Sequence, residues 1–300
     1  MHFPVAGIDV HPMVPLTVSF VVSFFTSMGG VSGAFLLLPF QVSVLNYTAP
    51  SVSATNQVFN IFAIPSGVYR YIREGRMLWP LTMAVVAGTL PGVFIGAWVR
   101  VEYLPEPTRF KFFAAFVLLY IGWRLAGDVM RNPVRSASDR FGSGQVAAPR
   151  ITVTVSSVRR VAFHFGEDAF SFSPPVVYAI CFLVGIAGGV YGIGGGAIVA
   201  PFFVAVVGLP VYAVAGAALM GTLVTSVAGV AFYHLLSGWY PATSVSPDWW
   251  LGGLFGLGGM AGMYLGARCQ KYVPARAIKA LLCGCVIFVG GSYLIGSVWR

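Results

Sequence analysis

Two glycine-rich segments interrupt long apolar stretches, and they are the strongest candidates for a binding site. The first runs from Ser27 to Gly33 and the second from Gly188 to Gly196. A helix that begins directly after such a break leaves its first N–H groups without partners and carries a partial positive charge. Glycines let the oxygen atoms of an anion reach these N–H groups, because no side chain stands in the way. Close helix packing is the alternative reason for the glycines. The predicted anion-binding residues of the two breaks are Gly30, Ser32, Gly33, Gly194, Gly195 and Gly196.

Neutral polar side chains lie in the apolar segment near residues 51–69, which we expect to be one membrane-spanning helix. Asn56 and Asn60 are one helical turn apart, so their carboxamides share one face of that helix. These amides can donate hydrogen bonds to an oxyanion, or they can bond across helices and hold the bundle together. The residue pattern leaves both roles open, and we include Asn56 and Asn60 in the predicted substrate site.

The acidic residues exclude another class of transporter. Every Asp and Glu lies in a loop or at the end of an apolar segment. No carboxylate is therefore placed to bind a cation or to relay protons inside a membrane. This argues against a metal-ion transporter, and we expect no metal site, no cofactor and no catalytic residue.

The composition shows which kind of protein must position these residues. Of the 300 residues, 57% are hydrophobic and only 9% are charged, and the mean hydropathy is +0.82. A soluble domain carries roughly 25% charged residues, so we expect this chain to have lipid as its solvent. The net charge of +9 comes from bases that lie between apolar stretches. Such bases orient membrane helices, and we expect no nucleic-acid partner.

The apolar stretches form two blocks with matching motifs, and this predicts an internal duplication. A shift of 162 residues places Gly30–Ala34 on Gly192–Gly196. The same order of further matches follows in both blocks: Pro39-Phe40 with Pro201-Phe202, Ser66-Gly67 with Ala228-Gly229, Gly92-x-x-x-Gly96-Ala97 with Gly262-x-x-x-Gly266-Ala267, and Lys111 with Lys279.

The number of segments and the basic residues predict that the two repeats are inverted. Each block has five apolar segments, and an odd number makes consecutive repeats insert in opposite orientations. The loop after the third segment carries Arg70, Arg73 and Arg76, whereas its counterpart, Ser237 to Asp248, has no Lys or Arg. Positive loops stay in the cytoplasm. We therefore expect an all-α polytopic membrane protein with two inverted five-segment repeats, about 8–10 transmembrane segments and short broken or re-entrant helices.

These blocks divide the chain into three parts. Residues 1–127 are the first membrane repeat, residues 128–173 a cytoplasmic linker, and residues 174–300 the second repeat. Within the linker, Ile151–Val155 and Val161–Phe165 alternate, and Gly166–Ala169 follows as an expected turn before Phe170–Phe172, which is a hairpin pattern. We expect a small β element there, too short for an independent enzyme domain.

The order of the motifs resembles the TauE/SafE sulfite-exporter family, whose members are also called toluene sulfonate uptake permeases. In both halves a glycine-rich break is followed by Pro-Phe, a third helix with Ser or Thr, and a Gly-x-x-x-Gly-Ala helix. The resemblance implies a multi-pass carrier of the bacterial inner membrane for sulfite, organosulfonates or related small oxyanions. Relatives often carry a Thr-Ser pair early in the third helix of the second half. Here that stretch reads Ala215-Gly216-Ala217-Ala218, and polar residues occur in the first half instead, so the substrate can differ.

The leading interpretation is a secondary transporter of a small sulfur-containing oxyanion that works by alternating access, with one repeat moving against the other. A passive anion channel is one alternative. An intramembrane sulfur-handling enzyme that uses Cys283 and Cys285 is another, although residues two apart on a helix point about 200° apart. The expected partners are the small anion and the lipid bilayer. The residues point to no particular coupling ion, direction of transport or oligomeric state.

Overall fold

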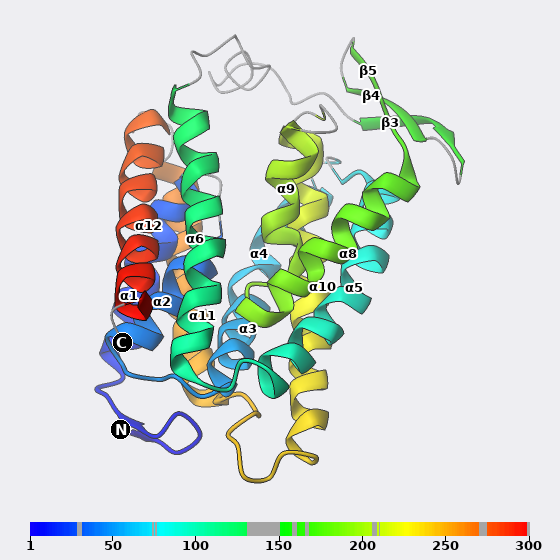
Figure 1. Cartoon of the computed structure of the whole chain (residues 1–300). Coiled ribbons are helices and arrows are strands. Elements are labelled where there is room, and N and C mark those ends of the chain that lie inside the picture. The colour runs from blue at the N-terminus through cyan, green and yellow to red at the C-terminus, as the bar shows by residue number, and fades with distance from the viewer. Residues whose placement is uncertain are drawn as a thin grey trace.

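In the computed structural model the chain forms a bundle of helices with two small sheets at its ends (Figure 1). The structure describes residues 1–28, 32–73, 75, 77–130, 151–157, 161–165, 168–205, 209, 211–269 and 275–298. The helices of the first half are α1 (Met13–Met28), α2 (Ala34–Ser43), α3 (Ser51–Ala63), α4 (Pro65–Arg73), α5 (Trp79–Glu102) and α6 (Pro107–Met130). Those of the second half are α8 (Pro174–Tyr191), α9 (Gly195–Ala205), α10 (Val211–Ser237), α11 (Trp249–Cys269) and α12 (Ala275–Val298).

Four helices in the described part of the chain are long and apolar enough to cross a membrane. They are Trp79–Glu102, Pro107–Gly127, Pro174–Tyr191 and Val214–Ser237. Shorter apolar helices cover Met13–Ser27, Ala34–Ser43 and Ala280–Gly296. The short helices α2 and α9 directly follow the two glycine-rich breaks, as the sequence predicts for broken segments.

The segment near residues 51–69 is not one helix, contrary to the prediction. Helix α3 ends at Ala63, and α4 starts at Pro65 after a break at Ile64. Pro65 has no N–H group to donate to the preceding turn, so the helical hydrogen bonding is interrupted there, although Ile64 keeps helical backbone angles (φ −81°, ψ −30°). In the second half, α10 has no such proline and continues without a break for 27 residues.

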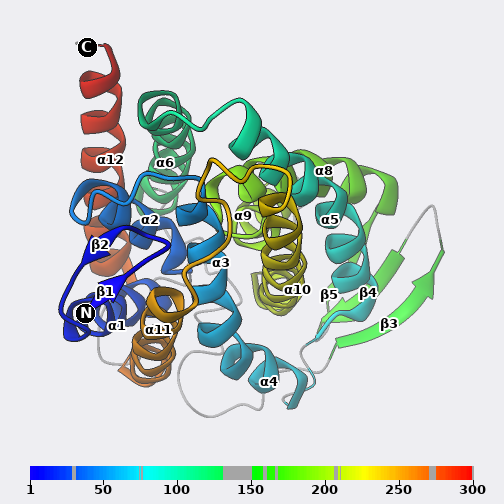
Figure 2. The same cartoon turned by 90° about the horizontal axis from the view of Figure 1, so that it is seen from below.

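Helices of the two halves pack in pairs across the molecule, as Figures 1 and 2 show. Helix α5 packs against α8, and α11 packs against α1. Helices α6 and α12 form a peripheral pair, while α3 lies near the middle and contacts both α10 and α11. The counterparts of α5 and α8 in the other half are α11 and α1. The contact between α5 and α8 is therefore equivalent to the contact between α11 and α1.

The same equivalence holds for individual residues. A Cβ added to Gly92 on α5 would overlap the carbonyl oxygen of Phe182, and one added to Gly262 on α11 would overlap that of Phe20. Gly262 is the counterpart of Gly92 in the Gly-x-x-x-Gly-Ala motif. Phe182 is the counterpart of Phe20 under the 162-residue shift. Three further contacts have an equivalent in the other half. They are Gly96–Ile186, equivalent to Gly266–Phe24; Gly67–Leu219, equivalent to Gly229–Gln57; and Gly122–Ile287, equivalent to Gly290–Leu119. Gly92, Gly96, Gly262 and Gly266 thus let backbones of the two halves touch directly, whereas the other four glycines contact side chains.

Two small sheets lie outside the helix bundle. Strands β1 (His2–Phe3) and β2 (Ile8–Asp9) pair antiparallel, and Ser244 donates a hydrogen bond to the carbonyl of Val5 at 2.9 Å in the intervening turn. Strands β3 (Ile151–Ser156), β4 (Val161–Phe165) and β5 (Asp168–Phe172) form an antiparallel sheet in the order β3-β4-β5. The three stretches expected in the β element lie in β3, β4 and β5, although Asp168 and Ala169, which were expected in the turn, already belong to β5.

The chain enters the two halves from opposite ends of the bundle. Helix α1 begins beside the N-terminal strands at the lower end of Figure 1, and α8 begins beside β5 at the upper end. Helices α1 and α2 therefore form a hairpin that enters from the lower end, and α8 and α9 form one that enters from the upper end.

Candidate functional site

The second glycine break is a tight turn between α8 and α9. Gly192 ends α8 with φ of 78°, and Gly194 has φ of 73°. Only glycine adopts this left-handed conformation without strain. Helix α9 begins at Gly195, whose backbone N–H donates to the hydroxyl of Thr225 on α10 at 3.3 Å. The first N–H group of α9 thus already has a side-chain partner.

The first glycine break lies between α1 and α2. Gly30 falls outside the described residues. Helix α2 begins at Ala34, whose N–H donates to the Ser32 hydroxyl at 3.4 Å. Gly33 is buried, and a Cβ added there would lie 2.9 Å from the hydroxyl oxygen of Ser23. Both breaks therefore have buried hydroxyl groups beside the start of a short helix.

Polar side chains of α3 bond to both breaks. The amide nitrogen of Asn56 donates to the carbonyl of Ala34 at 3.0 Å and to that of Gly192 at 3.2 Å. The amide nitrogen of Asn60 donates to the carbonyl of Ile193 at 3.2 Å. The two breaks therefore meet at α3, in the centre of the molecule (Figure 2).

The same bonds show what the two asparagines do in this conformation. Their N–H groups are held by backbone carbonyls, so they connect the broken segments. Asn60 also donates to the Ser226 hydroxyl at 3.2 Å. Its carbonyl oxygen is buried and has no partner in the described part of the chain.

Further polar residues belong to this cluster although they were not predicted as site residues. Gln41 on α2 donates to the side-chain oxygen of Asn56 at 3.3 Å. The hydroxyl of Tyr191 donates to the carbonyl of Phe35 at 2.9 Å, and that of Tyr233 to the carbonyl of Gly189 at 3.0 Å. Gln41 is a polar residue in the otherwise apolar α2, and this was the signal that could have identified it.

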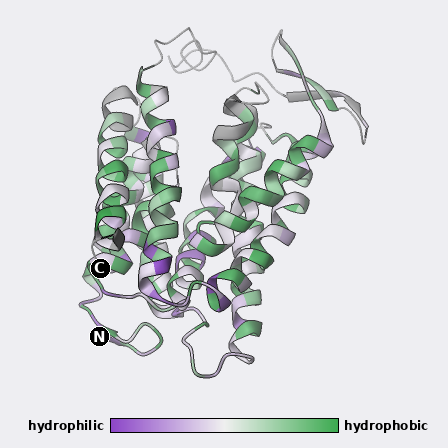
Figure 3. Cartoon of the chain, viewed as in Figure 1, coloured by the Kyte–Doolittle hydropathy of each residue, from purple (hydrophilic) through white to green (hydrophobic). Residues whose placement is uncertain are grey.

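The cluster is closed to solvent in this structure. Asn56, Asn60, Gln41, Thr225 and Ser226 are all 0% exposed. Hydrophobic residues predominate along the helices of the bundle, as Figure 3 shows. A ligand at the breaks would need the surrounding helices to separate before it could enter or leave.

One buried base was not predicted. Arg100 near the end of α5 is 0% exposed and forms no ion pair with the described residues. Its guanidinium donates to the carbonyls of Leu104 and Thr48, the latter at 3.1 Å, and stacks 3.8 Å above the Phe110 ring. Its Nε atom is buried and has no hydrogen-bond partner among the described residues. Arg100 thus joins two loops on the same side of the molecule.

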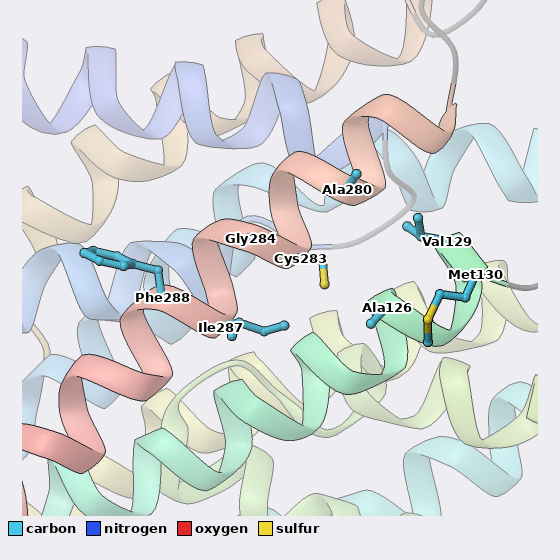
Figure 4. Close-up of a pocket in the computed structure, with 8 residues that line it drawn as sticks. All are labelled: Ala126, Val129, Met130, Ala280, Cys283, Gly284, Ile287 and Phe288. Atoms are coloured by element: carbon cyan, nitrogen blue, oxygen red, sulfur yellow. The ribbon is translucent and has the colours of Figure 1, made fainter.

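Cys283 and Cys285 lie in different environments, which weakens the alternative of an enzyme that uses both cysteines. Cys283 points from α12 toward α6 in an apolar groove (Figure 4) and donates to the carbonyl of Gly122 at 3.3 Å. Cys285 is exposed. The described residues also contain no group of three or more His, Cys, Asp or Glu that could hold a metal ion.

Comparisons with known proteins identify the family. The family model described as "Sulfite exporter TauE/SafE" matches residues 16–293. A curated relative, "Probable membrane transporter protein YunE" of Bacillus subtilis (strain 168), is 22% identical over 278 residues, which cover 89% of this chain and 93% of the relative. No solved structure matches the chain. The helices, the duplicated glycine motifs and this match over nearly the whole length show that the chain belongs to the TauE/SafE sulfite-exporter family of membrane transporters.

Proposed function

We propose that the protein is a secondary transporter of a small sulfur-containing oxyanion, such as sulfite or an organosulfonate, across the bacterial inner membrane. The observation that carries this proposal is the meeting of the two glycine breaks at α3, where Asn56 bonds to Ala34 and to Gly192. Paired broken helices in the two halves of a transporter mark its substrate site. The substrate site we propose contains the predicted residues of both breaks, Gly30, Ser32, Gly33, Gly194, Gly195 and Gly196, together with Asn56 and Asn60.

The transport mechanism we propose is alternating access between inverted repeats. Two observations support it: the reciprocated glycine contacts, and the entry of α1 and α8 from opposite ends of the bundle. In this proposal, a two-fold axis roughly perpendicular to the helices exchanges the two halves. Inverted repeats are related by such an axis. The closed polar cluster corresponds to an occluded conformation, in which the substrate would reach neither side.

The chemistry of the cluster favours an oxyanion over a cation. No Asp or Glu belongs to it, and its donors are N–H and hydroxyl groups. A fixed set of donors should favour a tetrahedral or pyramidal oxyanion over a planar carboxylate of equal charge. We expect sulfite, thiosulfate or sulfoacetate to raise the melting temperature of the purified protein, and acetate to raise it less.

Counterflow in proteoliposomes tests whether the protein is a carrier. Vesicles preloaded with unlabelled sulfite should transiently accumulate labelled sulfite above its external concentration, because a carrier exchanges one anion for another. A passive channel would only equilibrate the label. Equilibration without an overshoot would therefore replace the carrier with the channel alternative. Retained activity in the Cys283→Ser, Cys285→Ser double variant would remove the sulfur-handling enzyme alternative.

A further inference from the structure

Gln57 on α3 is a buried carboxamide whose two polar atoms are both unpaired. The residue is 0% exposed, and neither Oε1 nor Nε2 has a hydrogen-bond partner among the described residues. Burying an amide without a hydrogen bond costs free energy. Such a group is therefore a candidate for pairing with a ligand.

The position of Gln57 connects it to the second glycine break. A Cβ added to Gly229 on α10 would lie 2.8 Å from the Gln57 amide nitrogen, so this amide lies directly against the α10 backbone. Ser53 and Asn60 share the same face of α3. They donate to the carbonyls of Val190 and Ile193, at 2.9 and 3.2 Å. Gln57 thus lies between the two residues of this face that hold the break.

The other half of the molecule shows that this packing does not require an amide. Leu219 on α10 is the counterpart of Gln57; it is half-buried, and its Cδ1 would lie 3.5 Å from a Cβ added to Gly67, whereas the Gln57 amide lies closer to the Cβ position of Gly229. A leucine therefore fills the equivalent place between a helix and a glycine. The fold alone does not explain the glutamine.

We propose that Gln57 is the side chain that pairs with the transported oxyanion. The N–H groups of Asn56 and Asn60 are directed to backbone carbonyls, whereas the Gln57 amide has both N–H donors unused. These donors suit an S–O oxygen, and the amide oxygen of Gln57 accepts from a water molecule or from a protonated oxygen of the substrate. This assignment rests on the proposed function and names the side chain that binds the substrate directly.

Gln57→Leu tests the assignment, because Leu219 shows that a leucine fits such a place. Sulfite affinity of the purified full-length protein should fall about tenfold or more, since an anion loses its donor in a site that excludes water. The melting temperature without sulfite should stay equal or rise, because the variant removes an unpaired polar group. Leu219→Met is the matched control, and its sulfite affinity should equal that of the wild type.

The possible outcomes separate the two levels of the proposal. Unchanged sulfite affinity in Gln57→Leu would overturn the role of Gln57, and so would a loss of stability with affinity retained, which would mean that the amide pairs with a structural water. If Gln57→Leu does not fold, Gln57→Met replaces it, and failure of both to fold would show a structural amide and reject the assignment. A wild-type protein that neither binds nor transports any anion of the panel would instead refute the proposed function.

Discussion

The side-chain nitrogen of Asn56 lies 3.2 Å from the carbonyl oxygen of Gly192, a residue 136 positions later in the chain. Gly192 ends α8, and its left-handed backbone turns the chain into the second break. Asn56 also bonds to Ala34 at the start of α2. One amide therefore joins the broken segments of both halves.

Replacement of Asn56 should destabilise the protein, because its amide joins the broken segments of both halves. Asn56→Ala leaves the carbonyls of Ala34 and Gly192 buried without this donor, which costs about 1–3 kcal/mol. Asn56→Asp should cost more, because a carboxylate faces two carbonyl oxygens and its protonated form has only one donor. Unfolding of the purified variants in detergent measures both effects. Ser292→Ala is the control, since Ser292 is exposed and bonds only within α12. Equal stability of Asn56→Ala and the control would show that the bridge contributes nothing.

Gly195→Val should abolish sulfite transport by moving α9 away from α5. The reason is space, since the positive φ angles of this break belong to Gly192 and Gly194. A Cβ at Gly195 would lie 2.6 Å from the Cβ of Thr89. Uptake per amount of folded protein in proteoliposomes is the measurement. Gly253→Ala is the control, because nothing lies within 4 Å of its added Cβ. Normal uptake by Gly195→Val would remove Gly195 from the proposed site.

Labelling of introduced cysteines tests the inverted arrangement. Arg73 is the last residue of α4 and Ala242 lies in the loop after α10, and both residues are exposed. In a variant without native cysteines, a membrane-impermeant maleimide applied to intact cells should label Ala242→Cys but not Arg73→Cys. Ala242 suits this test better than Ser244, which hydrogen-bonds to Val5. Labelling of both positions from outside would contradict opposite orientations.

Arg100→Met should destabilise the C-terminal end of α5, because it leaves the half-buried carbonyls of Leu104 and Thr48 without their donor. The expected loss is about 2 kcal/mol or more, and Arg100→Lys should lose less because its ammonium still reaches one carbonyl. Arg109→Met is the matched control. Arg109 forms an exposed ion pair with Glu106 at 3.1 Å, and such pairs contribute about 0–1 kcal/mol. If both Met variants unfold alike, the buried contacts of Arg100 do not stabilise the fold.

The sequence predicted the elements with a strong local signal. The glycine breaks, the short helices after them and the two stretches that form β3 and β4 were visible as composition changes and periodicity. The break at Ile64 was missed because hydrophobicity continues through it, although Pro65 was a sufficient reason to expect it.

Residues whose roles depend on tertiary contacts could not be assigned in this way. Arg100 lies at the end of an apolar segment, where a base normally extends into water, and only the packing of Phe110 and two loops encloses it. Likewise, Gln57 and Asn56 are neighbours in one polar stretch. Among the described residues Gln57 is unpaired, whereas Asn56 bonds to Gln41, Ala34 and Gly192, and these partners come close only through the tertiary fold.

The glycine contacts also determine which parts of the molecule can move as one. No side chain separates Gly262 from the backbone at Phe20, or Gly92 from the backbone at Phe182. Sliding within either pair would force backbone atoms past each other, so α1 travels with α11, and α5 with α8. Each rigid body is therefore a composite that takes helices from both repeats. For the proposed alternating access we therefore expect these composites, rather than the two repeats named above, to move against each other.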